Sequence, residues 1–183
     1  MTGDADRSRL LQIARDAIAA HLTRVPPPAA EPGALALRRG GAFVTIHKAG
    51  ELRGCIGHIE PTDLITKVVA QCAVSAATTD PRFPAITPAE LPDIEIEISL
   101  LDAFDVVSGP SDIEIGRDGL LVELGRQRGL LLPQVAPEWK WNAETFLGQT
   151  CRKAGLPPDA WKHGATVRKF QAEVFAENPR RKT

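Results

Sequence analysis

The alternating segment DIEIEISLL, at residues 93–101, sets the strongest limit on what this chain can fold into. Apolar side chains fall on every second position, and Glu95, Glu97 and Ser99 fill the positions between them. Because successive side chains of a strand point to opposite faces of a sheet, the pattern predicts a half-buried strand with one apolar and one polar face. Such a strand needs an apolar layer on one side, so the chain must pack a sheet against other elements.

Helices and further strands are both predicted around this segment. Apolar residues at helical spacing predict helices at 7–22, from Thr62 to the TTDPRFP segment, and from Asn142 to Gly155. Period-two or glycine-punctuated runs predict a hairpin at 40–59, a meander at 111–135 with a first strand IEI, and a last strand at 165–177. Four prolines at 25–33 predict a stiff connector. Helices mixed with antiparallel strands, without repeated βαβ units, favour an α+β fold with sheets packed against helices in layers.

Charge and hydropathy argue against two classes of partner. The net charge is −1, and only the tail NPRRKT at 178–183 is markedly basic, so neither nucleic-acid nor membrane binding is predicted. The chain has no run of about 18 apolar residues and no basic-then-apolar leader at its start. Three widely spaced cysteines without a CxxC pair argue against a disulfide framework or structural zinc. These features predict a reducing, cytoplasmic setting.

Cys55 differs from the other two cysteines because it lies in LRGCIG, between Gly54 and Gly57, and not on a helix face. Cys72 and Cys151 fall on the apolar stripes of predicted helices, which predicts buried and unreactive thiols. If residues 51–57 are extended, Arg53, Cys55 and Gly57 share one face. A guanidinium beside the thiol would favour the nucleophilic thiolate, and the glycines would allow a backbone or ligand to approach.

An alternative places the same residues in the core, with Cys55 buried and Arg53 paired to a carboxylate. The register of the predicted hairpin leaves this question open. A two-residue turn at Ala49-Gly50 would put Cys55 opposite Val44 and His47 on the other face, and a slip of one residue would reverse that. Both readings are compatible with the sequence.

The remaining polar residues give weaker signals. Cys55 and His58 have C-x-x-H spacing, but a metal needs about three protein ligands, so no metal site is predicted. Asp80 and Arg82 flank Pro81, which favours a rigid helix stop with an Asp-Pro turn over a ligand site. The strand carboxylates, including Glu97, usually mark a solvated sheet face; if that face is covered, they become acid/base groups or partners of an arginine.

Five ordered segments together resemble a known family. They are LRGCIG at 52–57, DPRFP at 80–84, EIEISLL at 95–101, GLLLPQVAPEWKWNAETFL at 129–147 and CRKAGL at 151–156. In this combination the chain resembles the AMMECR domain family, also called AmmeMemoRadiSam system protein A, over about residues 8–177.

The resemblance implies a two-lobed α+β fold whose larger lobe is discontinuous, with about 5–105 and 141–177 in that lobe and a smaller β-meander lobe at about 106–140. It implies an association with a Memo-like protein and a radical S-adenosylmethionine enzyme, but no cofactor or reaction. The suspected site of the family falls here on Leu52, Arg53, Gly54, Cys55, Ile56 and Gly57.

Two alternative functions follow from these observations. One is a binding or adaptor protein that holds a small anionic ligand or a partner at the LRGCIG loop, with Arg53, Asp80 and Arg82. The other is an enzyme that uses Cys55 as a nucleophile or redox thiol, activated by Arg53, with backbone donors for a developing oxyanion. The sequence leaves the cofactor, substrate and reaction undetermined.

Overall fold

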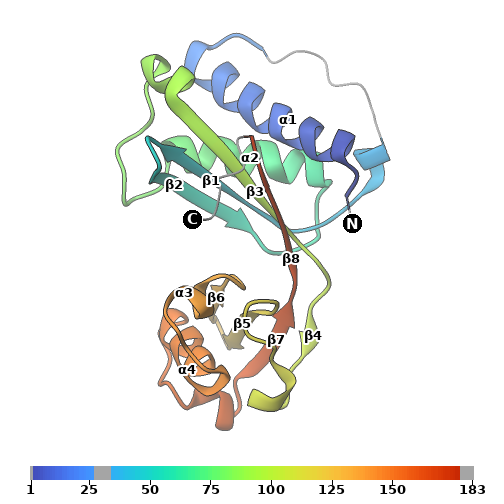
Figure 1. Cartoon of the computed structure of the whole chain (residues 1–183), viewed down its shortest axis with the longest axis vertical. Helices are drawn as coiled ribbons and strands as arrows, with labels where there is room; N and C mark the ends of the chain where they lie inside the picture. Colours follow the sequence, from blue (N-terminus) through green and yellow to red (C-terminus); the bar gives the residue numbers. More distant parts are fainter. Residues whose placement is uncertain (1, 27–33, 178–183) are drawn as a thin grey trace. The chain divides into compact units, whose positions relative to one another are not determined.

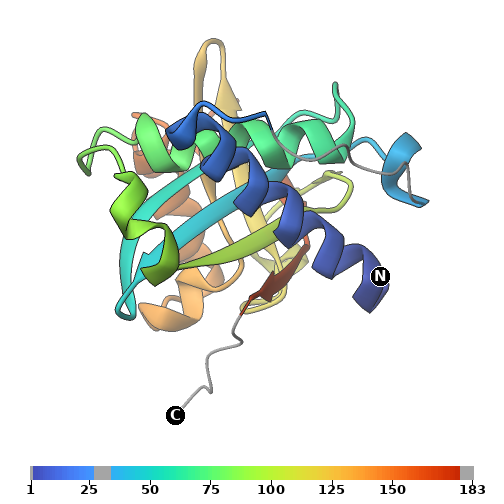
Figure 2. The ribbon, with the colours of Figure 1, turned by 90° about the horizontal axis from the view of Figure 1, so that it is seen from above.

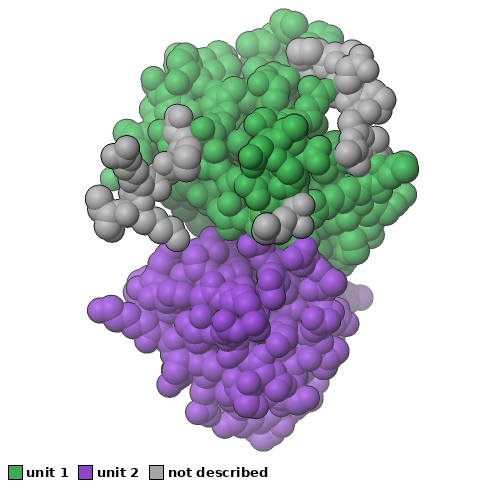
Figure 3. Space-filling model, turned by 45° about the vertical axis from the view of Figure 1, so that its right-hand side comes forward, with its two compact units in different colours: residues 1–101, 173–183 green, residues 102–172 purple. Residues whose placement is uncertain are grey.

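The computed structural model describes residues 2–26 and 34–177 (Figure 1). The chain forms two compact units, residues 1–101 with 173–183 and residues 102–172 (Figure 3). The first unit is therefore discontinuous in sequence. Most of the predicted connector at 25–33, and the whole basic tail at 178–183, lie outside the described residues.

The first unit contains a four-stranded sheet in the order β2, β1, β3, β8 (Figure 1). Its strands are β1 (Ala42–Lys48), β2 (Glu51–His58), β3 (Ile94–Leu101) and β8 (Ala172–Ala176). β1 pairs antiparallel with both β2 and β3. Ala49 and Gly50 both have positive φ, at 49° and 86°, as a tight turn between twisted antiparallel strands requires. The predicted hairpin and the alternating strand are both present.

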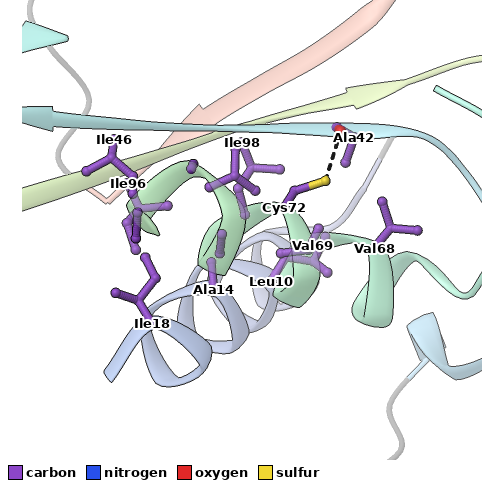
Figure 4. Close-up of a cluster of buried hydrophobic side chains, with 14 of the residues drawn as sticks. Leu10, Ala14, Ile18, Ala42, Ile46, Val68, Val69, Cys72, Ile96 and Ile98 are labelled. Atoms are coloured by element: carbon purple, nitrogen blue, oxygen red, sulfur yellow. Dashed lines mark hydrogen bonds between the residues drawn. The ribbon is translucent and has the colours of Figure 1, made fainter. Parts of the chain in front are cut away.

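Two helices cover one face of this sheet, α1 (Asp4–Thr23) and α2 (Ile65–Thr78) (Figure 2). The core between them is apolar (Figure 4): it takes Ile46 from β1, Ile96 and Ile98 from β3, and small or branched side chains from both helices. Cys72 belongs to this core, with its Sγ 3.7 Å from the carbonyl oxygen of Ala42. The alternation of residues 93–101 therefore reports the side of the sheet that the helices bury.

Shorter elements complete the first unit. They are η1 (Ala34–Leu37) and η2 (Pro88–Asp93), and η2 begins with the reciprocal capping box of Thr87 and Glu90. The returning strand β8 is fastened at its end by Glu177, whose carboxylate accepts from the Arg15 side chain of α1 and from the backbone N–H of Ile96. This ion pair and the sheet together hold the two sequence segments of the unit in place.

The second unit has its own sheet, in the order β4, β7, β5, β6. Its strands are β4 (Asp105–Val106), β5 (Gly119–Leu124), β6 (Gln127–Leu131) and β7 (Thr166–Phe170), and its helical elements are η3 (Pro110–Asp112), α3 (Val135–Glu138), α4 (Ala143–Lys153) and η4 (Ala160–Lys162). Asn142 caps α4 by accepting the N–H of Thr145. At Gly129 of β6, a Cβ would lie 2.3 Å from the nitrogen of Ala154, so only glycine permits this close packing of helix end on sheet.

Three details of this unit differ from the expectation. The predicted strand IEI at 113–115 is not formed: η3 ends just before it at Asp112, and a turn begins at Ile115. The predicted last strand at 165–177 is two strands, β7 and β8, which belong to different sheets. The unit extends to residue 172 and so includes α4, whereas the predicted division put residues from 141 onward in the larger lobe. The apolar side chains of α4, among them Phe146 and Leu147, are buried in the core of this second unit.

Candidate functional site

Cys55 lies on the face of the first sheet that points away from the helices. In the register of the sheet, Thr45 of β1 stands between Cys55 of β2 and Glu97 of β3. Val44 and Ile46 point into the helical core, so Thr45 and its two neighbours point to the opposite face. The Thr45 hydroxyl donates to the Cys55 sulfur at 3.2 Å. Three polar side chains from three strands therefore form one row.

Asp80 and Arg82 meet this row from the turn that follows α2. The Asp80 side chain is 2% exposed, and its Oδ2 accepts the backbone N–H of Cys55 at 2.9 Å. Arg82 donates from Nε to Oδ1 of Asp80 at 3.0 Å and from Nη2 to Oδ2 at 2.7 Å. Nη2 also reaches the carbonyl oxygen of Cys55 at 3.4 Å. The turn is thus a rigid helix stop, as expected, and it also binds to the backbone of Cys55.

The Arg53 guanidinium does not lie beside the thiol, contrary to the expectation that it would activate Cys55. It pairs with Glu90 at 3.2 Å and donates to the carbonyl oxygen of Pro84 at 2.7 Å. The cause is an irregularity in the hairpin: Ile46 pairs with Gly54 and His47 with Leu52, so Arg53 has no partner in the ladder. The part of the alternative reading in which Arg53 pairs with a carboxylate describes the structure. The other part does not, because Cys55 is only partly buried and lies outside the helical core.

Glu90 collects this second set of charges. Its carboxylate also accepts from Lys48 at 3.0 Å and from the backbone N–H of Thr87 at 3.0 Å. The Thr87 N–H, Lys48 and Arg53 together lower the pKa of Glu90 to about 2. Arg53 is therefore part of a charged cluster that fastens η2 to the hairpin.

The electrostatics of the site favour a neutral thiol. Burial raises the pKa of the Cys55 thiol above its ordinary value, and the nearby carboxylates of Asp80 and Glu97 act in the same direction. The Thr45 hydroxyl and the Arg82 guanidinium oppose this shift without reversing it. The hydrogen bonds from Arg82 hold the pKa of Asp80 well below its usual range, so Asp80 is a permanent anion near neutral pH.

The two glycines of LRGCIG have different structural roles. A Cβ at Gly54 would lie 2.1 Å from the carbonyl oxygen of Ala76, so Gly54 lets α2 pack directly on β2. A Cβ at Gly57 would lie 2.2 Å from the ring of Phe43, so that ring lies over the backbone of Gly57. Gly54 faces the helical core, and only Gly57 is on the side of Cys55.

The histidines do not complete a metal site. The His58 ring is exposed and lies 3.3 Å from the Thr62 hydroxyl. Among residues 2–26 and 34–177, no group of three or more His, Cys, Asp or Glu side chains is placed to hold a metal ion.

Cys151 is buried in the core of the second unit, as predicted for an inert thiol. Within the same described ranges, no helix has both the length and the apolar character to cross a bilayer.

The expected residues thus separate into two groups. The structure brings together Cys55, Asp80, Arg82 and Glu97, with Gly57 beside them, and it places Arg53 and Gly54 in packing roles. Thr45 and Phe43 were missed. The alternation of β1 puts both on the polar face, but a simple two-residue turn predicted Val44 opposite Cys55, and the irregularity at Arg53 shifted that register by one residue.

A separate hollow of about 360 Å³ lies in the second unit, beside α4. Asn142, Glu144 and Arg152 are among its lining residues, together with Trp161 and Lys162. Lys162 bridges it, pairing with Glu144 at 3.1 Å and lying 4.7 Å from the centre of the Trp161 ring. None of the site residues expected from the sequence lines this hollow.

Comparison with known proteins places the chain among archaeal relatives. The family model described as AMMECR1 matches residues 11–175. A protein of Methanothermobacter thermautotrophicus is 49% identical, with 92% of this chain and 93% of that protein covered. One from Methanosarcina barkeri is 40% identical, with 97% and 93% covered. The crystal structure of an uncharacterized protein from Pyrococcus horikoshii is similar, with a TM-score of 0.85, 38% identity, and 92% and 90% of the two chains covered.

Proposed function

The chain belongs to the AMMECR1 family, and from that premise we propose that its first unit is a binding module that holds the anionic group of a small ligand at Arg82, beside Cys55. The observation that carries the proposal is the fixed position of Arg82. Its guanidinium is held by a buried carboxylate, yet the Arg82 side chain is 54% exposed. A cation oriented in advance loses little conformational freedom when a ligand binds.

The hydrogen bonds of Arg82 leave one nitrogen for a ligand. Asp80 accepts from Nε and Nη2, and no described residue accepts from Nη1. A carboxylate or phosphate oxygen is the partner that this donor favours, because guanidinium groups bind such oxygens with charge-assisted hydrogen bonds. The Cys55 thiol, Thr45 and Glu97 would supply weaker polar contacts on the neighbouring sheet face.

The raised pKa of Cys55 supports binding over nucleophilic catalysis. The thiolate is the nucleophile, and a thiol whose pKa is raised by burial is almost fully protonated at neutral pH. Catalysis by Cys55, as nucleophile or redox thiol, is the second candidate. The observation in its favour is that Thr45 and Arg82 both stabilise the thiolate, whereas the Glu97 carboxylate destabilises it. A substrate that neutralised or moved the Glu97 carboxylate would therefore make Cys55 more reactive.

The family resemblance motivates a further proposal on partners and location. A Memo-like protein and a radical S-adenosylmethionine enzyme are the proposed functional associates, and the cytoplasm is the proposed location. Neither rests on a contact in this chain. Copurification of the three proteins from cells that express them at native levels would test the association.

A pair of alkylating reagents tests the binding proposal without knowledge of the natural ligand. Iodoacetate is an anion and iodoacetamide is neutral, and both modify thiols. We expect the ratio of their rates at Cys55 to exceed the ratio in the unfolded chain by about tenfold, because a local cation concentrates the anionic reagent. Peptide mass spectrometry separates Cys55 from Cys72 and Cys151 in the same sample.

Two variants make this result specific. Arg82→Gln should reduce the rate ratio to that of the unfolded chain, and Lys67→Gln, which removes an exposed cation of α2, should leave it unchanged. A ratio at Cys55 that equals the unfolded value, or that survives Arg82→Gln, would contradict an anion site at Arg82.

A further inference from the structure

The open edge of β2 continues past the contact with Asp80 and Arg82. β2 is the outermost strand of its sheet (Figure 1). The backbone N–H and C=O of Cys55 point away from β1, as their hydrogen bonds with Asp80 and Arg82 show. In an antiparallel ladder this direction repeats every second residue. The register is unbroken between Cys55 and Gly57, so the N–H and C=O of Gly57 also point to the open edge.

No described residue hydrogen-bonds to these two groups of Gly57. They form one donor and one acceptor side by side on a strand edge, which is the arrangement that pairs with an added strand. Along a strand, the N–H of each residue precedes its C=O. Asp80 therefore binds the N–H of Cys55, which is farther from Gly57, and Arg82 binds the C=O of Cys55, which is nearer. The N–H of Gly57 is the next donor along the edge after the Arg82 guanidinium.

The surface beside Gly57 is apolar. The Phe43 ring occupies the space that a side chain at Gly57 would fill, with ring carbons 2.2–2.4 Å from the position of its Cβ. A strand added at this edge would put the side chain of the residue opposite Gly57 on the face that carries Phe43. An apolar side chain at that position would pack against the ring.

We propose that this edge binds the C-terminal residue of an extended peptide, antiparallel to β2. The terminal carboxylate accepts from the N–H of Gly57 and from Arg82, and the N–H of the same residue donates to the C=O of Gly57. Its apolar side chain packs on Phe43. This inference rests on the proposed anion site at Arg82 and specifies its ligand.

Two observations favour a peptide end over an internal segment: the occupied backbone groups of Cys55 and the charge of Arg82. Asp80 and Arg82 already occupy the backbone groups of Cys55, so an added strand has no place to continue beyond Gly57. It must end there. An ammonium end would face the guanidinium of Arg82, whereas a carboxylate end complements it.

Three probes test this proposal by NMR titration, in which the backbone amide signals of the isotope-labelled full chain are followed. They are the peptide acetyl-Ala-Ala-Leu with a free carboxylate, the same peptide as its C-terminal amide, and 4-methylpentanoate, which has the carboxylate and the apolar chain but no peptide N–H. We expect the free-acid peptide to shift the Gly57 amide signal. It should bind at least about tenfold more tightly than either of the other two, since each of them lacks one charge-assisted or backbone bond.

The outcomes separate this inference from the proposed function. Equal affinities for the peptide acid and 4-methylpentanoate, with no shift at Gly57, would keep the anion site and overturn the peptide mode. No binding of either acid would overturn both. Equal affinities for peptide acid and amide would show that the carboxylate is not recognised, which also overturns the inference. Arg82→Gln should abolish the preference for acid over amide, and Lys67→Gln should retain it.

Discussion

The Asp80 carboxylate accepts the backbone N–H of Cys55 at 2.9 Å, although the two residues are 25 positions apart and lie in a turn and a strand. This bond places the arginine of the same turn beside the thiol. It also satisfies a backbone donor that an edge strand would otherwise leave open. The candidate site at LRGCIG is therefore built in part by a segment outside LRGCIG.

Replacement of Asp80 by alanine should destabilise the first unit. The change leaves the N–H of Cys55 without a partner and frees Arg82, so we expect a loss of about 2 kcal/mol in the free energy of unfolding. Urea denaturation measures it. Asp63→Ala is the matched control, because it removes only a solvent-exposed i,i+4 pair with Lys67, which contributes little to stability. Equal losses in the two variants would contradict this role of Asp80.

Glu90 should make stability fall in acid. Its pKa is lowered from 4.5 to about 2 in the folded chain. A carboxylate with a depressed folded pKa stabilises the fold above its unfolded pKa, and this contribution is lost as the pH falls from about 5 to about 2. The free energy of unfolding, measured across this window, should decline less steeply in Glu90→Gln than in the parent chain. Parallel curves for the two proteins would show that Glu90 is not responsible.

Cys55 should react slowly and titrate late. The rate of alkylation by neutral iodoacetamide, followed against pH, should have its midpoint above the ordinary thiol pKa of 9.0. Thr45→Val should move the midpoint higher still, because the hydroxyl that stabilises the thiolate is removed. A midpoint at or below 9.0 in the parent chain would favour Cys55 as a nucleophile and so the enzymatic alternative.

Arg53 and Arg82 should separate into a stability role and a binding role. Arg53→Ala removes the pair with Glu90 and the bond to Pro84, so we expect a loss of about 1–3 kcal/mol in the free energy of unfolding. The ratio of iodoacetate to iodoacetamide rates at Cys55 should stay unchanged. If Arg53→Ala reduced that ratio as much as Arg82→Gln does, Arg53 would belong to the anion site.

Gly54→Ala should disturb packing and not binding. The added methyl would lie 2.1 Å from a backbone oxygen of α2, which cannot move without the helix, so a loss of about 3 kcal/mol is expected. Thermal or urea unfolding measures it. Gly109→Ala is the control, because a Cβ there meets nothing within 4 Å. A small effect at Gly54 would mean that α2 shifts easily on β2.

Local patterns predicted most of the elements because their causes are local. The alternation of 93–101 and the apolar stripes around Cys72 and Cys151 identify which side chains are buried, and the structure confirms all three. The predicted strand IEI does not form, because three residues carry too little periodicity to compete with η3 before them and the turn after them. The last strand was divided at Gln171, where the chain passes from one sheet to the other, and no residue pattern marks that change.

By itself, the sequence determined the α+β class and the family and pointed to the stretch where the candidate site lies, because these depend on periodicity and on ordered motifs. Only the tertiary structure decided which arginine stands beside Cys55. That choice depends on two features. Arg53 is left without a partner in the hairpin ladder and pairs with Glu90, and a hydrogen bond from Cys55 to Asp80 holds Asp80 and Arg82 at the strand edge. A shift of one residue in register reverses the face of every side chain, and spacing along the chain carries no record of it.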